Sequence, residues 1–237
     1  MSYDLNARVE LCVWSESWIE GSSSIIDLAI QRGYGVIGFV HGRNAYGVES
    51  LFDTIKLAKM YQNRIKVLYG MKLCIELEVD LGDFTDLGQC DVICYAKNVH
   101  GIHILRKLAL LQQRDCVVSE RDFLSHADDL LIGVQHSSIN HFAPDATYLP
   151  RCDFCLFHPS VEGVSGFASQ LIEKHKSLIC ATSAEEIESD EFNTTNEMLA
   201  QMPYIIPEKA YEFVVTNPQK IADMCEHITD LPDESED

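Results

Sequence analysis

Residues 36–52 read VIGFVHGRNAYGVESLF, and this stretch decides the fold class. Its first part, Val36–Val40, is a short continuous apolar run, which is typical of a strand buried on both faces. After the loop His41–Gly47, the segment Glu49–Tyr61 carries apolar residues at helical spacing. A buried strand followed by a helix is the repeating unit of α/β proteins, so the stretch predicts that class.

The same alternation of short strands and longer helices continues on both sides of this stretch. Before it, Val9–Trp14 is a predicted strand, and the serine run Ser22–Ser24 can cap a helix through Ile25–Arg32. Strands separated by helices imply parallel pairing with right-handed crossovers, and about six or seven of them favour a closed or nearly closed barrel over an open sheet. After it come predicted strands at Ile65–Leu77, Asp91–Ala96, Leu130–Val134, Asp153–Phe157 and Leu178–Thr182, and predicted helices at Gly101–Gln112, Gly166–Lys174 and Glu185–Met202.

Composition narrows the functional classes. The 237 residues are 46% hydrophobic, which is enough for one sizeable core. Lys and Arg total 18 against 37 Asp and Glu, so the net charge of −19 has the wrong sign for a protein that holds nucleic acid by its phosphates. The sequence has no long apolar run and no secretory signal at its start, so we expect a cytoplasmic protein that has no membrane segment.

The charge is uneven along the chain. Residues 222–237 contain seven acidic side chains and no Lys or Arg. Such a segment has too little apolar content to order itself. We therefore predict one barrel domain at residues 1–221 and an acidic, disordered tail at residues 222–237.

The nine cysteines are scattered, odd in number and mostly embedded in apolar runs. They are interpreted as small buried hydrophobic residues in a reducing compartment. Cys152 and Cys155, with His158 nearby, have the C-x-x-C spacing of zinc sites. No second such pair follows to complete a tetrahedral set, so buried thiols are the favoured interpretation.

Three histidines, His41, His136 and His158, each lie at or just after the end of a predicted strand. In an α/β barrel the carboxyl ends of the strands converge, and three imidazoles there could hold a metal ion. The alternative is that each histidine simply bonds to loop backbone. The sequence lacks the phosphate-loop, dinucleotide-binding, serine-hydrolase and zincin motifs. The residues that those four classes of protein need for binding or catalysis are therefore not present in their usual pattern.

Five fragments, at residues 21–29, 35–52, 65–72, 94–108 and 217–226, together resemble a known family. They include an N-x-[FY]-G turn at Asn44–Gly47 and the closing N-x-x-x-I-A-x-x-C segment at Asn217–Cys225. In order and spacing they resemble the PHP domain, more narrowly the N-terminal PHP domain of the bacterial DNA polymerase III alpha subunit. The resemblance implies a distorted seven-stranded α/β barrel related to the TIM barrel.

The resemblance also implies where metal ligands would fall. Active members of the family bind up to three metal ions through His, Asp, Glu and Cys side chains. Here the first H-x-H falls on Leu11 and Val13, and the D-H pair falls on His41 and Gly42. The Glu position carries Lys72, and the last D-x-H falls on Ala184 and Glu186. The family's Cys position falls near His136. Most of these residues cannot bind or polarise a metal-bound water, so the catalytic centre is predicted to be replaced.

These departures set the functional expectation. We expect a catalytically inactive, free-standing PHP-like domain without a cofactor, which binds a protein partner such as a replicative polymerase or a proofreading exonuclease subunit. Direct binding of nucleic acid or membrane is not expected. The alternative is a residual phosphoesterase that holds Zn or Mn through His41, His136 and His158, together with Glu10 or Glu186.

Overall fold

A computed structural model describes residues 8–15, 19–42, 45–80, 85–136, 149–159, 164–182 and 192–229. The strands are β1 (Arg8–Ser15), β2 (Tyr34–His41), β3 (Lys66–Asp80), β4 (Thr85–Ala96), β5 (Val118–Ser119), β6 (Leu130–His136), β7 (Phe154–Phe157) and β8 (Leu178–Ala181). The helices are α1 (Ile19–Gln31), α2 (Ala45–Tyr61), α3 (Val99–Asp115), α4 (Glu120–Leu124), α5 (Val164–His175), α6 (Thr195–Ala200), α7 (Pro207–Tyr211) and α8 (Asn217–Asp223). Within the described ranges no helix has the length and apolar character needed to span a membrane.

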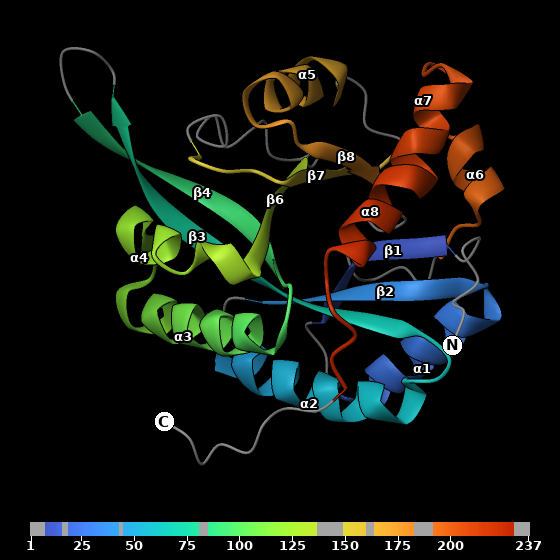
Figure 1. The fold of residues 1–237 in the computed structure, drawn as a ribbon, viewed down its shortest axis with the longest axis horizontal. Coiled ribbons are helices and arrows are strands. Elements are labelled where there is room, and N and C mark those ends of the chain that lie inside the picture. The colour runs from blue at the N-terminus through green and yellow to red at the C-terminus, as the bar shows by residue number, and fades with distance from the viewer. Residues whose placement is uncertain are drawn as a thin grey trace.

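One mixed sheet organises the molecule, with the strand order β1-β2-β3-β4-β6-β7-β8 and the short β5 paired beside β3. Only β4 runs against its neighbours β3 and β6; every other pair in this order is parallel. The carboxyl ends of the remaining strands therefore lie toward one edge. The sheet curls into a half-barrel (Figure 1), and α8 packs against both end strands, β1 and β8.

The fold prediction is therefore correct at the level of class. The protein is α/β with a curled, half-barrel sheet, whereas closure into a complete seven-stranded barrel is not seen in the described residues. The expectation of parallel pairing throughout is wrong at β4. A hairpin joins β3 and β4 directly, so no crossover helix separates them and they pair antiparallel from Gly70↔Tyr95 to Asp80↔Thr85.

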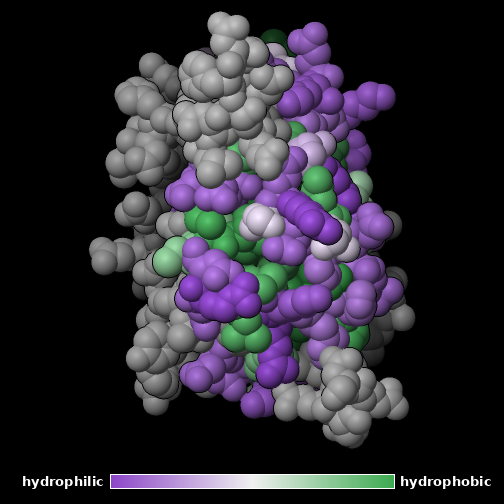
Figure 2. Space-filling model, turned by 90° about the vertical axis from the view of Figure 1, so that its left-hand side faces the viewer, coloured by the Kyte–Doolittle hydropathy of each residue, from purple (hydrophilic) through white to green (hydrophobic). Residues whose placement is uncertain are grey.

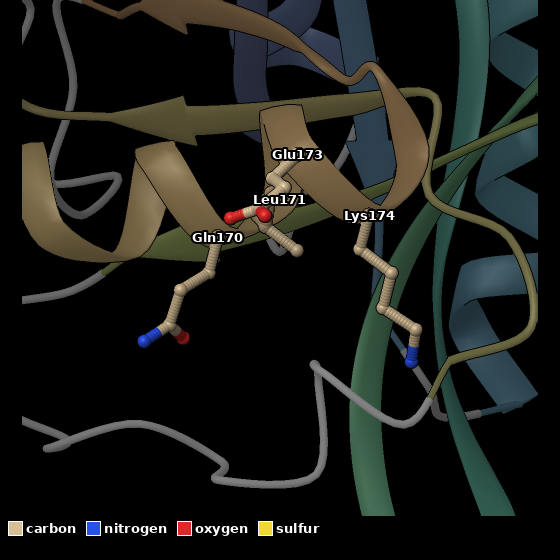
Figure 3. A pocket seen from close by; sticks show the side chains of 4 residues that line it. All are labelled: Gln170, Leu171, Glu173 and Lys174. Carbon is tan, nitrogen blue, oxygen red and sulfur yellow. The ribbon is translucent and has the colours of Figure 1, made fainter.

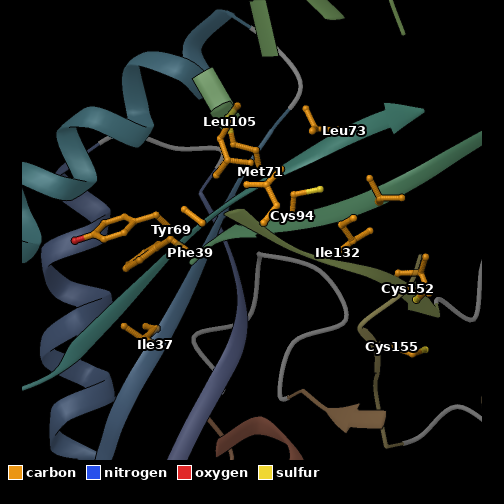
Figure 4. Close-up of a cluster of buried hydrophobic side chains, with 14 of the residues drawn as sticks. Ile37, Phe39, Tyr69, Met71, Leu73, Cys94, Leu105, Ile132, Cys152 and Cys155 are labelled. Carbon is orange, nitrogen blue, oxygen red and sulfur yellow. The ribbon is translucent and has the colours of Figure 1, made fainter. Parts of the chain in front are cut away.

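Side chains alternate between the two faces of the sheet. In β2, Ile37 and Phe39 belong to the cluster shared with the helices, together with Tyr69 of β3, and Figure 4 shows these side chains gathered on one side of the strands. Val36 and Val40 belong instead to a separate cluster on the concave face. The sheet is thus buried on both sides, which explains the continuous apolar run in β2.

Several predicted boundaries are wrong. The first helix begins at Ile19, so the serine run lies inside α1 and does not cap it. The predicted acidic helix through Glu185–Met202 is not continuous, because residues 192–194 are not helical. Instead, a capping box starts α6: the Thr194 hydroxyl accepts from Glu197 N at 3.3 Å, and the Glu197 carboxylate accepts from Thr194 N at 2.6 Å.

The predicted division at residue 221 stays a prediction. Ala222, Cys225 and Ile228, the first part of the predicted tail, are buried. Ala222 and Cys225 join the concave cluster, and the Tyr69 hydroxyl donates to the Ile228 carbonyl at 3.1 Å. Packing therefore continues to Ile228, and residues 230–237 of the predicted tail lie outside the described residues.

Candidate functional site

The candidate site is the concave face of the half-barrel and the edge where its strands end. Leu11 of β1, the first of the matched metal-ligand positions, is fully buried there. Its neighbours in the concave apolar cluster include Tyr95, Phe154 and Ile221. A leucine in this environment offers only dispersion contacts, so this position can hold the fold but cannot hold an ion.

A hydrogen bond crosses the concave face at the same residue. The Tyr95 hydroxyl, from β4, donates to the Leu11 carbonyl, from β1. These strands are not neighbours, because β2 and β3 lie between them in the sheet. The phenol group therefore spans the curl of the sheet and occupies space on its concave side.

Glycines make room for the aromatic rings on this face. A Cβ on Gly38 would lie 2.7 Å from the Leu11 carbonyl oxygen and 2.9 Å from the Tyr95 hydroxyl, and one on Gly70 would lie 2.7 Å from the Tyr95 ring. A Cβ on Gly133 would overlap the Phe154 ring. The two rings lie 5.7 Å apart between centroids. The interior is therefore filled by aromatic packing over small residues.

Lys72 takes the position that the resemblance assigns to a metal-binding Glu. Its Nζ lies 3.0 Å from Asp91 Oδ2 on the antiparallel partner β4. Both side chains are about one-third exposed, so water screens the pair. A carboxylate is present near this edge, but it is neutralised by an ammonium group, and a cation would have to displace that group.

His41, at the carboxyl end of β2, is completely buried. Neither of its ring nitrogens has a hydrogen-bond partner among the described residues. Burial lowers the pKa of His41 to about 4, so the imidazole is neutral at neutral pH. The alternation of β2 places His41 on the face of Ile37 and Phe39, opposite to the concave face that holds Leu11.

Strand pairing brings His136 beside the end of β7, which His158 follows, and leaves His41 on a separate part of the sheet. His41 pairs with Met71 of β3, whereas His136 ends β6 and pairs with Phe157 of β7. Strands β3 and β4 separate β2 from β6. His158 directly follows β7, is partly buried and has partners of its own.

The other matched positions are described only in part. Val13 pairs with Phe39, and its side chain lies outside the described residues, as does that of His136. Gly42 follows His41, and a Cβ there would meet nothing within 4 Å. Ala184 and Glu186 lie outside the described residues altogether.

Glu10, the carboxylate considered with the histidines, is buried in the middle of β1 and pairs with Ile37. Glu10 lies near Arg8, whose pKa is lowered overall because the effect of burial outweighs the opposing effects of Tyr34 and Glu10. Among the described side chains, no three of His, Cys, Asp or Glu lie close enough together to hold a metal ion. The described residues at the matched positions therefore do not form the metal centre that the resemblance implies.

Cys152 and Cys155 are both buried. Burial raises the pKa of Cys152 to about 11 and that of Cys155 well above its ordinary value. Zinc binds the thiolate, which is strongly disfavoured here. The Cys152 thiol donates to the Phe154 carbonyl at 3.2 Å, as expected for a buried structural cysteine.

A separate hollow of about 410 Å³ lies against α5. Gln170, Leu171, Glu173 and Lys174 line its described part (Figure 3). Their charges are mixed, and none of the predicted site residues is among them. This hollow offers no chemistry related to the strand-end residues.

Sequence analysis did not find the two contacts that define this site. Tyr95 lies within the strand Asp91–Ala96, which was recognised, but its bond to Leu11 depends on the curl of the whole sheet. Asp91 was not linked to Lys72 because the hairpin between β3 and β4 was not predicted. The signal was present, since apolar and acidic residues alternate from Glu76 to Asp80 as in a half-buried strand.

A comparison with known protein families finds no match. Over 44 residues, or 19% of the chain, the sequence is 48% identical to the protein "DNA polymerase III PolC-type" of Clostridium perfringens (strain 13 / Type A). The matched stretch represents 3% of the length of that polymerase. The similarity is local and covers a small part of both chains.

Proposed function

We propose that this protein is a catalytically inactive PHP-like domain, related to DNA polymerase III, that acts by binding a protein partner in or on a replication complex. The curled sheet is taken to be the distorted barrel of that family, with α8 packed between its end strands. The domain holds no metal ion and catalyses no phosphoester hydrolysis. Its surface carries the function.

The observation that carries this proposal is the packing on the concave face. Leu11 lies in an apolar cluster, its carbonyl accepts from Tyr95, and Lys72 pairs with Asp91. Metal-assisted hydrolysis needs several anionic or imidazole ligands in a polar cavity. Leu11 and Lys72, at two of these positions, offer no such ligand, and this supports the proposal.

The local similarity to a PolC-type DNA polymerase III supports the link to replication. Fold likeness alone does not assign a role, because function depends on the residues of the site. A domain that keeps the fold and lacks the ligands can still present the surfaces by which the family contacts other proteins. We infer that it acts through such surfaces.

Charge supports a basic partner. The net charge of −19 creates a negative potential that speeds encounter with positively charged proteins and slows encounter with nucleic acid. This steering acts mainly on the association rate and weakens with salt. The partner is expected to be a polymerase or a proofreading exonuclease subunit.

A pull-down at low salt tests this function. The purified chain is immobilised and exposed separately to a purified PolC-type polymerase and to a purified proofreading exonuclease. Retention of one of them, weakened by added salt, is the expected result. Failure to retain either protein at low salt would contradict the proposal.

His41 favours a second candidate, a residual metal-dependent phosphoesterase. A buried neutral imidazole with two unpartnered nitrogens is a competent metal ligand. If this candidate is correct, the purified protein carries bound zinc or manganese and hydrolyses a generic phosphate ester. The change His136→Ala would then abolish the hydrolysis. If the purified protein is instead free of metal and inactive, the phosphoesterase candidate is excluded.

A further inference from the structure

Three large exposed apolar side chains lie close together in the sequence, two between α6 and α7 and one at the end of α7. Tyr204, Ile206 and Tyr211 are 53%, 64% and 52% exposed, and we call these three residues the 204–211 patch. The other strongly exposed large apolar residues of the described ranges lie on separate elements or after α8: Met60, Leu110, Leu124, Ile172 and Met224. Single exposed apolar residues are ordinary, whereas a cluster marks an interaction site.

The patch is held in place before any partner binds. Pro207 begins α7, and the Ile206 carbonyl accepts from the backbone N–H groups of Lys209 and Ala210, both at 3.0 Å. The Tyr204 hydroxyl donates to the Pro159 carbonyl at 2.5 Å. Tyrosines with few rotatable bonds on a fixed backbone lose little entropy on binding, which favours their use as anchors.

The position of the patch connects it to the candidate site. Pro159 lies two residues after the end of β7, so Tyr204 lies beside the edge where the parallel strands end. In Figure 1, α6 and α7 lie side by side on the side of the molecule opposite to α3 and α4. The patch therefore borders the region that the family uses for chemistry, although none of its residues is a metal ligand.

The opposite side of the molecule differs in hydropathy and in charge. Figure 2 shows that hydrophilic residues there surround and separate the apolar ones. Residues 97–129, which contain α3, α4 and the short helix Ala127–Asp129 that packs against both, carry five Lys and Arg against five Asp and Glu. A surface with balanced charge is less suited to the basic partner proposed above.

Charge around the patch is negative. Glu208 is exposed beside it, and Glu212 pairs with Lys209 at 2.6 Å. Residues 192–212 carry three acidic residues and one Lys. A second copy of this chain would bring like charges together, whereas a basic segment would complement them.

We propose that the 204–211 patch docks a basic protein segment that carries at least one large apolar side chain. This inference deepens the proposed function and rests on it for the identity of the partner class. The apolar side chain packs between Ile206 and Tyr211, and a Lys or Arg of the segment reaches Glu208. The apolar contact supplies most of the binding affinity, whereas the charges orient the segment and raise its association rate.

The test uses three synthetic peptides of equal length, which contain Lys and Leu, Lys alone, or Glu and Leu. Their binding to the full chain is followed by fluorescence anisotropy at low salt. The Lys–Leu peptide is expected to bind at least about tenfold more tightly than either of the others. The paired change Ile206→Asp and Tyr211→Ser should weaken it about tenfold, whereas Met60→Asp, at a residue 79% exposed on α2, should leave it unchanged.

Three results would overturn the inference. Equal binding of the Lys-only peptide would mean that charge alone acts, and full binding by the paired variant would place the contact elsewhere. A patch-dependent dimer in sedimentation would make the occupant a second copy. Circular dichroism and urea unfolding verify that the variants fold. Because no replication protein is present, this outcome is independent of the polymerase pull-down.

Discussion

The Tyr95 hydroxyl of β4 donates a hydrogen bond to the Leu11 carbonyl of β1 across the concave face of the sheet. Leu11 is the first position at which the resemblance to PHP domains would place a metal-binding histidine. The bond ties together two strands that are not neighbours, within an apolar cluster on the concave face. Structural packing on this face is thus the basis of the proposed loss of catalysis.

Removing this hydrogen bond should destabilise the protein. Tyr95→Phe leaves the buried Leu11 carbonyl without its side-chain donor, and the expected loss is about 1–3 kcal/mol in the free energy of unfolding. Urea denaturation measures it. Tyr211→Phe, on an exposed residue, is the matched control and should change stability by less than about 0.5 kcal/mol. Equal effects of both changes would refute a structural role for the bond.

Gly38 should not tolerate a side chain. Gly38→Ala puts a methyl group 2.7 Å from the Leu11 carbonyl oxygen and 2.9 Å from the Tyr95 hydroxyl, and backbone cannot easily move away. The expected cost is about 1–3 kcal/mol, measured by thermal or urea unfolding. Gly42→Ala faces open space and serves as the control. A neutral Gly38→Ala would show that the concave face is less tightly packed than described here.

The ion pair between Lys72 and Asp91 should contribute little to stability. Both groups are about one-third exposed, so a double-mutant cycle with Lys72→Met and Asp91→Asn should give a coupling energy below about 1 kcal/mol. Added salt should reduce it further. A coupling of several kcal/mol would mean that the pair is effectively desolvated, contrary to its exposure.

His41 should make stability depend on pH. Its folded-state pKa of about 4 lies below its ordinary value of 6.5, so between these values the unfolded chain binds more protons than the folded one. The contribution is therefore fully present above pH 6.5 and is lost as the pH falls toward 4, by about 3 kcal/mol in total. His41→Phe should remove this part of the slope in unfolding experiments.

The control for that experiment is His103→Gln, a change at a partly exposed histidine of α3. This change should not alter the pH dependence of the free energy of unfolding that His41 causes between pH 4.5 and 6.5. If His41→Phe leaves the profile unchanged, His41 is not the buried neutral group described here. In that case the argument for a neutral, unpartnered imidazole at the end of β2 fails.

The fold class could be predicted from local pattern, whereas the contacts of the site could not. Continuous apolar runs such as Val36–Val40 identify strands buried on both faces, and the structure has β2 there. The antiparallel β3–β4 pair was not predicted because the predicted strands end at Leu77 and begin at Asp91, whereas the observed ones extend to Asp80 and from Thr85. The Lys72–Asp91 and Tyr95–Leu11 contacts depend on that hairpin and on the curl of the sheet, which periodicity does not encode.

Whether the three histidines share a site could not be predicted from the sequence, for a related reason. Sequence places His41, His136 and His158 at the ends of strands, but it does not give the order of the strands in the sheet. The hairpin inserts β3 and β4 between β2, which carries His41, and β6, which carries His136. The 204–211 patch was also not predicted, because exposure of an apolar residue depends on what the rest of the chain covers.

The metal content of the purified protein tests the central claim most directly. Elemental mass spectrometry on protein prepared without chelator should find less than about a tenth of an equivalent of zinc, manganese or iron per chain, because the matched positions lack a ligand set. One or more equivalents, together with hydrolysis of a phosphate ester that needs the metal, would contradict the account. The strand-end histidines would then become the catalytic centre.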